Sequence, residues 1–316
     1  MPEPAGAAEP IAFTVIGGFL GAGKTTLLQH WLANQDGLRL AVLVNDFGAI
    51  NLDAMEVSGS GGDVVALSNG CVCCSIGDDL SQALLRILAM PTRFDGVVVE
   101  ASGVSDPWRI AQIALAEPRL QLSAVVLMVD AAHISTQAQN PLLADTLSRP
   151  LGHADLVVLN KTDLATPQAL ANAQAWLKAH ACEAPVLEVT QAQVAPHWLH
   201  QRLYQGHGGL PAWRRHDTQF EAATLQPPGV YDAGRIRQWV RQLPPDTLRL
   251  KGLVPTTDGA WLQLSWAGRH GTARPYRGAS PPLATTVIAI GLAGHLPLGA
   301  IADGLTACRA DNDSTF

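Results

Sequence analysis

The stretch at residues 17–26 constrains this chain more than any other, because it fits the phosphate-binding pattern G-x-x-x-x-G-K-[ST]. The residues in the required places are Gly18, Gly23, Lys24 and Thr25. In this pattern the glycines let backbone N–H groups close around a β-phosphate. The lysine places its positive charge next to the oxygens of the β- and γ-phosphates, and the threonine hydroxyl binds Mg²⁺. An apolar run at 11–16 precedes the loop and a helical pattern at 26–32 follows it. Strand, loop and helix therefore occur in the order of a nucleotide-binding α/β fold.

Length and charge narrow the class of protein. With 316 residues the chain should hold about two domains. A net charge of −6 argues against a nucleic-acid-binding surface, which needs clustered Lys and Arg. Residues 1–10 contain no Lys or Arg, so they lack the positive start of a secretory signal. The uncharged run at 283–302 contains a proline and three glycines, which favour a strand, a turn and a helix over a membrane span. We therefore expect a cytoplasmic protein.

Further apolar runs read as strands at 38–44, 94–99, 124–130, 155–159 and 185–189. In a parallel α/β sheet, ligands gather outside the carboxyl ends of the strands. Asp46, just after the second strand, is placed to serve the nucleotide-bound Mg²⁺. Glu100 ends the third strand as the carboxylate that senses Mg²⁺ or positions water, and Gly103 can offer its N–H to the γ-phosphate. The expected catalytic residues are Lys24, Glu100 and Asp46.

The tetrad of residues Asn-Lys-Thr-Asp at 160–163 indicates which nucleotide base the chain binds. Asp163 can accept hydrogen bonds from guanine N1–H and the exocyclic amine, whereas adenine presents the wrong donors. Lys161 would lie along the base plane and Asn160 would brace the loops, so GTP is favoured over ATP. The residues expected to contact the nucleotide are Gly18, Gly21, Ala22, Gly23, Lys24, Thr25, Thr26, Gly103, Asn160, Lys161 and Asp163.

Three of the five cysteines fall within four residues, at Cys71, Cys73 and Cys74. Thiolate is the soft ligand that Zn²⁺ prefers, and three thiolates leave one coordination position open. The alternatives are buried structural cysteines and a redox pair without metal. A transition-metal site is the favoured interpretation.

The composition divides the chain into a flexible tail at 1–10, a P-loop domain at 11–193, a linker at 194–216 and a domain at 217–316. The linker holds four of the ten histidines. We interpret these four as solvated side chains rather than as metal ligands. Short alternating segments after 217 predict a smaller α+β domain. The fold class is thus α/β, a P-loop GTPase domain with a mostly parallel doubly wound sheet, followed by that α+β domain. Trp261 and Trp266, five apart, should point to opposite faces of a strand.

Taken together, these segments resemble the CobW-type GTPases, the metallochaperones of the G3E family that are related to the nickel-insertion GTPases of urease and hydrogenase. The motifs that carry the resemblance are Gly-Gly-Phe-Leu-Gly-Ala-Gly-Lys-Thr-Thr at 17–26, Asn-Asp-Phe-Gly at 45–48, Asn-Gly-Cys-Val-Cys-Cys at 69–74, Glu-Ala-Ser-Gly at 100–103 and Asn-Lys-Thr-Asp at 160–163. It is strong over about 1–200. The remainder is more diverged and is similar chiefly at 248–252.

The resemblance implies a cytosolic GTPase that uses Mg²⁺, binds Zn²⁺ or another transition metal at Cys71, Cys73 and Cys74, and delivers it to a client metalloprotein. Nucleotide state would set metal affinity, and pairing as a homodimer is left open. The chain lacks the histidine run of many relatives, which argues against metal storage, and the fourth metal ligand is open because Val44 and Ala49 stand where some relatives have carboxylates. A regulatory GTPase that gates a protein partner without metal delivery, and a metal-sequestering protein, are the alternatives.

Overall fold

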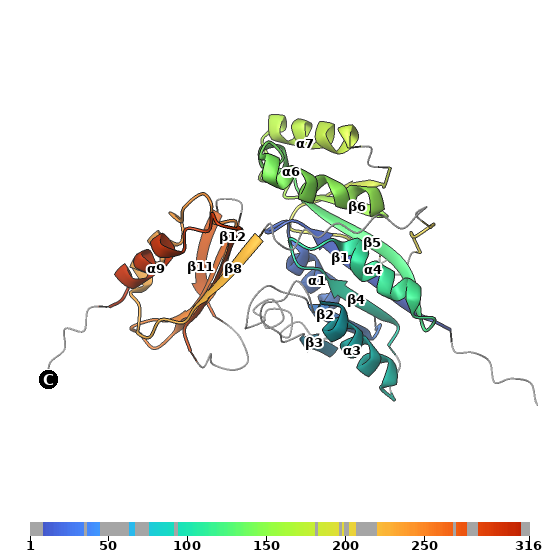
Figure 1. Ribbon diagram of the computed structural model, residues 1–316, viewed down its shortest axis with the longest axis horizontal. Coiled ribbons are helices and arrows are strands. Elements are labelled where there is room, and N and C mark those ends of the chain that lie inside the picture. Colours follow the sequence, from blue (N-terminus) through green and yellow to red (C-terminus); the bar gives the residue numbers. More distant parts are fainter. Residues whose placement is uncertain are drawn as a thin grey trace, which may run out of the picture. The chain divides into compact units, whose positions relative to one another are not determined.

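The alternating strands and helices of the first two hundred residues form one parallel sheet with helices packed against it, as a computed structural model shows (Figure 1). The chain divides into two compact units. The structure describes residues 9–34, 37–44, 63–66, 76–91, 94–180, 183–195, 198, 202–206, 220–267, 270–276 and 284–310.

Within the described residues, the sheet of the first unit contains seven parallel strands in the order β3-β2-β4-β1-β5-β6-β7. Their bounds are β1 (Ile11–Gly18), β2 (Leu40–Val44), β3 (Asp63–Ala66), β4 (Gly96–Glu100), β5 (Leu120–Asp130), β6 (Leu156–Asn160) and β7 (Val186–Glu188). Strands β2, β4 and β6 are buried along their whole length, as expected of strands covered on both faces. Because β1 lies between β4 and β5, the loop that follows β1 stands at the middle of the sheet edge.

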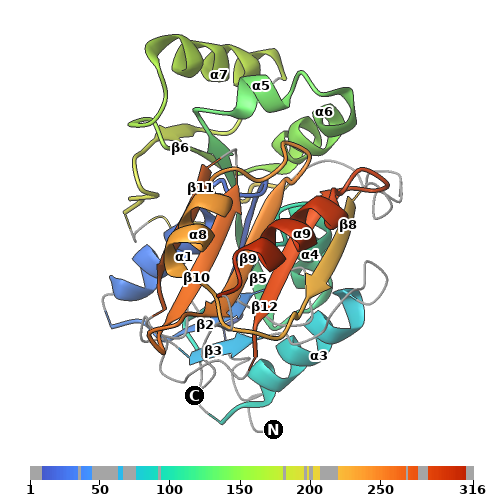
Figure 2. The same cartoon turned by 90° about the vertical axis from the view of Figure 1, so that its left-hand side faces the viewer.

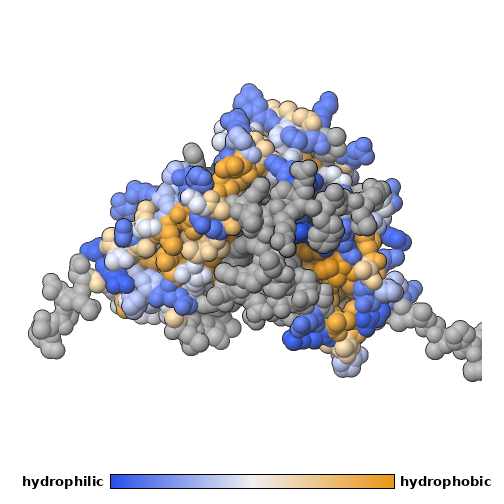
Figure 3. Space-filling model, viewed as in Figure 1, coloured by the Kyte–Doolittle hydropathy of each residue, from blue (hydrophilic) through white to orange (hydrophobic). Residues whose placement is uncertain are grey.

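The helices of this unit are α1 (Lys24–Ala33), α3 (Ile76–Ala89), α4 (Pro107–Ala116), α5 (Ile134–Gln137), α6 (Pro141–Ser148), the 3-10 turn η2 (Arg149–His153) and α7 (Pro167–Ala179). Three of them begin with proline preceded by a side-chain cap, from Asp106, Asn140 and Thr166. Helices α3 and α4 share one apolar cluster with the sheet. The region around α7 is largely hydrophilic at the surface (Figure 3), where only Ala173 and Leu177 of this helix are buried.

Strand β5 has one extra residue relative to β1, and backbone groups of residues 203–204 are hydrogen-bonded to it. The register of β5 against β1 shifts by one residue and leaves Ser123 without a partner position on β1. The Ser123 carbonyl accepts hydrogen bonds from the backbone nitrogens of Leu203, at 2.9 Å, and Tyr204, at 2.8 Å. The described part of the predicted linker at 194–216 therefore packs on the first unit.

The second unit is an antiparallel sheet in the order β11-β10-β9-β12-β8. Its elements are β8 (Phe220–Leu225), α8 (Ala233–Trp239), β9 (Arg249–Pro255), β10 (Trp261–Ala267), β11 (His270–Pro275), β12 (Thr286–Leu292) and α9 (Leu298–Ala307). Helices α8 and α9 lie over one face of the sheet (Figure 2) and share an apolar core with it. Trp266 belongs to this core, whereas Trp261 packs against the small cluster of Leu253 and Ile288. The two tryptophans thus point to opposite faces, as the sequence predicts.

The uncharged run at 283–302 is confirmed as a strand, a turn and a helix, because its described residues form β12, the following turn and the start of α9. None of the helices in the described part of the chain combines the length and the apolar composition that crossing a bilayer requires.

Candidate nucleotide-binding site

The predicted phosphate loop joins β1 to α1 in the structure. Its glycines Gly18, Gly21 and Gly23 have φ values of 130°, 77° and 106°, in the region that L side chains rarely adopt. Gly23 is the N-cap of α1, and a Cβ added there would lie 2.4 Å from Asn160 Nδ2. Glycine is therefore required at this position by both the backbone conformation and the neighbouring side chain. The first turn of α1 contains no acidic residue, so its N–H groups suit an anion.

Lys24 folds back into this loop. The side chain is 3 % exposed, and Nζ donates to the carbonyl oxygens of Gly18, at 2.9 Å, and Phe19, at 3.2 Å. The ammonium group is therefore held inside the loop by backbone oxygens. The contact of this lysine with the β- and γ-phosphates stays a prediction of the motif.

Thr25 and Glu100 meet beside the loop. Thr25 Oγ1 donates to Glu100 Oε1 over 3.0 Å, and Glu100 is 2 % exposed at the end of β4. The parallel register aligns Glu100 with Ile16 on β1, which brings strand β4 to the same edge as the loop. A hydroxyl and a carboxylate are hard oxygen ligands of the kind that Mg²⁺ prefers. Among the other predicted contacts, Ala22 is buried and Thr26 is exposed.

Gly103 touches the phosphate loop directly. A Cβ added to Gly103 would lie 2.5 Å from Leu20 Cδ2 and 3.0 Å from the Leu20 backbone nitrogen. The segment is held from both sides, because Ala101 N donates to Ile16 O over 2.8 Å and Asp106 caps α4 through Trp108 N. The loop after β4 thus lies against both the backbone and the side chain of Leu20 in the phosphate loop.

Asn160 connects the phosphate loop to a third segment. Its Nδ2 donates to Ala22 O over 3.0 Å, and its Oδ1 accepts from Ala192 N over 2.8 Å. The side chain is 2 % exposed. Gln191 and Ala192 have φ values of 49° and 55°, so the turn after β7 is in an uncommon conformation. These contacts agree with the bracing role predicted for Asn160 and bring residue 192 to the site.

The rest of the tetrad has two different environments. Asp163 is exposed, which leaves its carboxylate accessible for the predicted contact with guanine. Lys161, with φ 62°, extends its ammonium to Asp130 at the end of β5, with Nζ 2.6 Å from Asp130 Oδ2. His133 Nδ1 lies 3.1 Å from the same oxygen. Burial acts to raise the pKa of Asp130, but hydrogen bonds and charge from His133 and Lys161 outweigh it and hold this pKa below its ordinary value.

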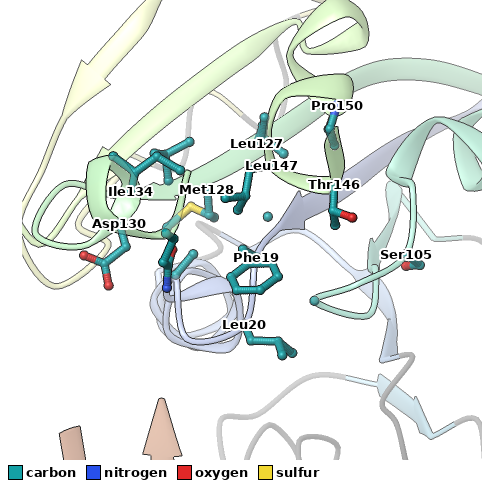
Figure 4. A pocket seen from close by; sticks show the side chains of 15 residues that line it. Phe19, Leu20, Ser105, Leu127, Met128, Asp130, Ile134, Thr146, Leu147 and Pro150 are labelled. Atoms are coloured by element: carbon teal, nitrogen blue, oxygen red, sulfur yellow. The ribbon is translucent and has the colours of Figure 1, made fainter. Parts of the chain in front are cut away.

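Sequence reasoning did not single out Asp130 as a site residue. Its only signal was an acidic residue at the end of an apolar strand, the same signal that points to Glu100. Asp130 also lies at one end of a cavity beside the phosphate loop, with Ser105 at the other end and Phe19 between them (Figure 4). Apolar side chains of β5, α5 and α6 complete the wall of this cavity.

Several predicted residues lie outside the described part of the chain. They are Asp46 and the proposed metal ligands Cys71, Cys73 and Cys74. Within the described ranges, no three His, Cys, Asp or Glu side chains come together in a group that could hold a metal ion. The predicted metal site thus stays a prediction.

With this geometry in hand, comparison with known families gives two matches. Residues 12–188 match the nucleotide-binding domain described as CobW/HypB/UreG, and residues 220–309 match the CobW C-terminal domain. The chain belongs to the CobW/HypB/UreG family. The two matched regions correspond to the two units of the structure.

Curated members of the family are similar over part of their length. The zinc chaperone YjiA of Escherichia coli (strain K12) is 38 % identical over 165 residues, which is 50 % of this chain and 51 % of that protein. The zinc-regulated GTPase metalloprotein activator 1 of Schizosaccharomyces pombe is 34 % identical over 196 residues, 59 % of this chain and 47 % of that protein. The chain spans about half the length of these CobW-family relatives.

Solved structures of the CobW/HypB/UreG family also match. Zn(II)-bound YjiA GTPase from E. coli gives a TM-score of 0.44 at 24 % identity, covering 96 % of this chain and 100 % of that one. HypB from Helicobacter pylori in complex with nickel gives 0.42 at 16 % identity, covering 60 % and 82 %.

Proposed function

We propose that this chain is a cytoplasmic GTPase that binds zinc, or another transition metal, at Cys71, Cys73 and Cys74 and transfers it to a client metalloprotein. The observation that carries the nucleotide part is the pair of hydrogen bonds by which Asn160 donates to Ala22 O and accepts from Ala192 N, because they connect the tetrad at 160–163 to the phosphate loop. Family membership and relatives named as zinc chaperones support the metal part.

Different residues of the site would contact the phosphates and the base of the nucleotide. The phosphates would lie against the first-turn N–H groups of α1, where Lys24 exchanges its bonds to backbone oxygens for phosphate oxygens. Asp163 would accept the two guanine hydrogens from its exposed position. Because adenine lacks these donors, its binding would leave the carboxylate without partners.

The donor set also fits Mg²⁺. Thr25 Oγ1 and Glu100 lie 3.0 Å apart beside the loop, so the hydroxyl can bind the ion directly and the carboxylate directly or through water. When bound, Mg²⁺ neutralises charge that develops on the phosphate oxygens. Opening the Thr25–Glu100 hydrogen bond would release both groups for this task.

In the hydrolysis step, a water oxygen bonds to the γ-phosphorus while the bond from that phosphorus to the bridging oxygen breaks, which gives GDP and phosphate. We propose that Lys24 stabilises the bridging and γ oxygens, that Asp46 serves the Mg²⁺ ion, that Glu100 positions the water, and that Gly103 donates its N–H to the γ-phosphate. Loss of that phosphate would release Gly103, whose backbone contacts the phosphate loop at Leu20.

Nucleotide and metal titrations test the proposal. We expect the chain to bind GDP more tightly than ADP, and Lys24→Ala to abolish turnover. With a GTP analogue bound, zinc affinity should differ from that of the GDP form, since linkage requires metal and nucleotide to affect each other equally. Equal zinc affinities in both states would refute the switch.

Cysteine variants test the metal site. Changing Cys71, Cys73 and Cys74 to serine should lower zinc affinity by more than about a hundredfold, on the order of what removing ligands and their support costs. Cys308→Ala is the matched control, because this cysteine is buried, 4 % exposed, in the second unit. Zinc affinity unchanged in the triple variant would favour the alternative of a regulatory GTPase that gates a protein partner. Binding that ignores the nucleotide would favour metal sequestration.

A further inference from the structure

The ion pair between Asp130 and Lys161 lies beside the tetrad at 160–163. Lys161 is expected to lie along the base plane, whereas Asp130 has no part in the functions assigned above. Strand β5 ends at Asp130 and strand β6 ends at Asn160, and the parallel register places these two residues side by side. Asp130 therefore stands next to the first residue of the tetrad, although 30 residues separate them in sequence.

The carboxylate of Asp130 is held by three groups. Oδ2 accepts from Lys161 Nζ at 2.6 Å and lies 3.1 Å from His133 Nδ1, and Oδ1 accepts from Ala132 N at 2.9 Å. The Asp130 side chain is 8 % exposed and the Lys161 side chain 23 %. In Figure 4 this carboxylate is directed away from Phe19, out of the cavity beside the phosphate loop. Because the carboxylate is buried and the ammonium group is mostly shielded from water, this ion pair restricts both side chains more than an exposed pair would.

Lys161 needs such support because of its backbone. Its φ of 62° lies in the left-handed region, which is costly for a residue with a long side chain. The turn is closed by Leu164 N, which donates to Lys161 O over 3.0 Å, and by Thr162 N and Oγ1, which both donate to Val189 O. Asp163 stands inside this turn, so the direction of its carboxylate depends on the conformation of Lys161.

We propose that Asp130 is a positioning residue for guanine recognition. It fixes Lys161 by an ion pair, and through Lys161 it fixes the turn that presents Asp163 to the N1–H and the exocyclic amine of the base. This inference rests on the proposed GTP binding. It assigns a specificity role to a residue on a different strand from the tetrad.

The ratio of the affinities for GDP and inosine diphosphate shows whether Asp130 positions Asp163 or only stabilises the fold. Inosine lacks the exocyclic amine that Asp163 is proposed to bind, so only a positioning role changes this ratio. Isothermal titration should show that the wild type prefers GDP. Asp130→Asn keeps the acceptor for Ala132 N and removes the charge, and we expect it to lower the ratio of GDP to inosine diphosphate affinity about fivefold or more, from the loss of a charged hydrogen bond. Asp145→Asn, which removes a 57 % exposed carboxylate paired with Arg149, should leave the ratio unchanged.

Two further results show whether Asp130 acts through Lys161. If Asp130 acts through Lys161, the double variant Asp130→Asn/Lys161→Ala should have the same ratio as Lys161→Ala alone. A lower ratio in the double variant, or equal weakening of both nucleotides in Asp130→Asn, would overturn the inference. Should Asp130→Asn not fold by circular dichroism, Lys161→Ala carries the test, and a wild-type ratio in that variant would overturn it.

The wild-type measurement separates this inference from the function on which it rests. A wild type that binds ADP, GDP and inosine diphosphate alike would refute the proposed GTP site together with the role of Asp130. A guanine-selective wild type whose ratio survives Asp130→Asn would refute the role of Asp130 alone.

Discussion

Replacing Asn160 with alanine should weaken both the fold of the first unit and its affinity for nucleotide. The substitution removes two buried hydrogen bonds, of 3.0 Å to Ala22 O and 2.8 Å from Ala192 N. Each backbone group left without a partner costs about 1–3 kcal/mol, and water entering the space lowers the sum. We therefore expect the free energy of unfolding of the first unit to fall by about 2–4 kcal/mol.

Urea unfolding without nucleotide measures this loss. The two units can unfold separately, so the transition of the first unit is identified as the one that GDP shifts to higher urea. Titration calorimetry then gives the GDP affinity, which should fall about thirtyfold if about 2 kcal/mol of loop organisation must be restored on binding. Asn172→Ala is the control, because Asn172 is exposed on α7, where it accepts a hydrogen bond from Gln168 Nε2 at 2.8 Å. Stability within about 0.5 kcal/mol of the wild type would refute the reasoning for Asn160.

Three other predictions concern neighbouring contacts. Gly103→Ala places a Cβ against Leu20, and should slow GTP hydrolysis about 10–100-fold while GDP affinity stays within about threefold; an unchanged rate in a phosphate-release assay would contradict the close approach. Trp31→Phe removes the 3.1 Å bond from Nε1 to Val194 O, and should cost about 1–3 kcal/mol in urea unfolding. The pKa of Asp130 is held below its ordinary 3.8, so its contribution to stability is present above that pH and is lost as the pH falls further. The stability difference between wild type and Asp130→Asn should shrink there, and a constant difference would count against the ion pair.

The parts of the fold that sequence predicts best are those with a strong local signal. The apolar run at 124–130 lies within β5, and the run at 155–159 overlaps β6, because strands buried on both faces need unbroken apolar sequence. Strand β11 was missed, since its residues alternate between exposed and half-buried at the edge of the sheet and form no apolar run.

The site divides in the same way. Lys24 and Asn160 were predicted because side-chain motifs mark them, and the structure places both at the phosphate loop. The backbone nitrogen of Ala192 has no side-chain signature that could assign it a specific partner. The role proposed for Asp130 depends on the register that sets β5 beside β6, and no local sequence pattern predicts which strands become neighbours.

The contact between Gly103 and Leu20 differs in kind from the ion pair at the other end of the site. Gly103 lies against the backbone and the side chain of Leu20, and neither residue has a side-chain charge that salt can screen or a side-chain proton that titrates. Any movement that the proposed hydrolysis passes through this contact should therefore be insensitive to ionic strength and pH. Of these two contacts, the one between Gly103 and Leu20 therefore depends on shape, whereas the ion pair of Asp130 and Lys161 depends on charge.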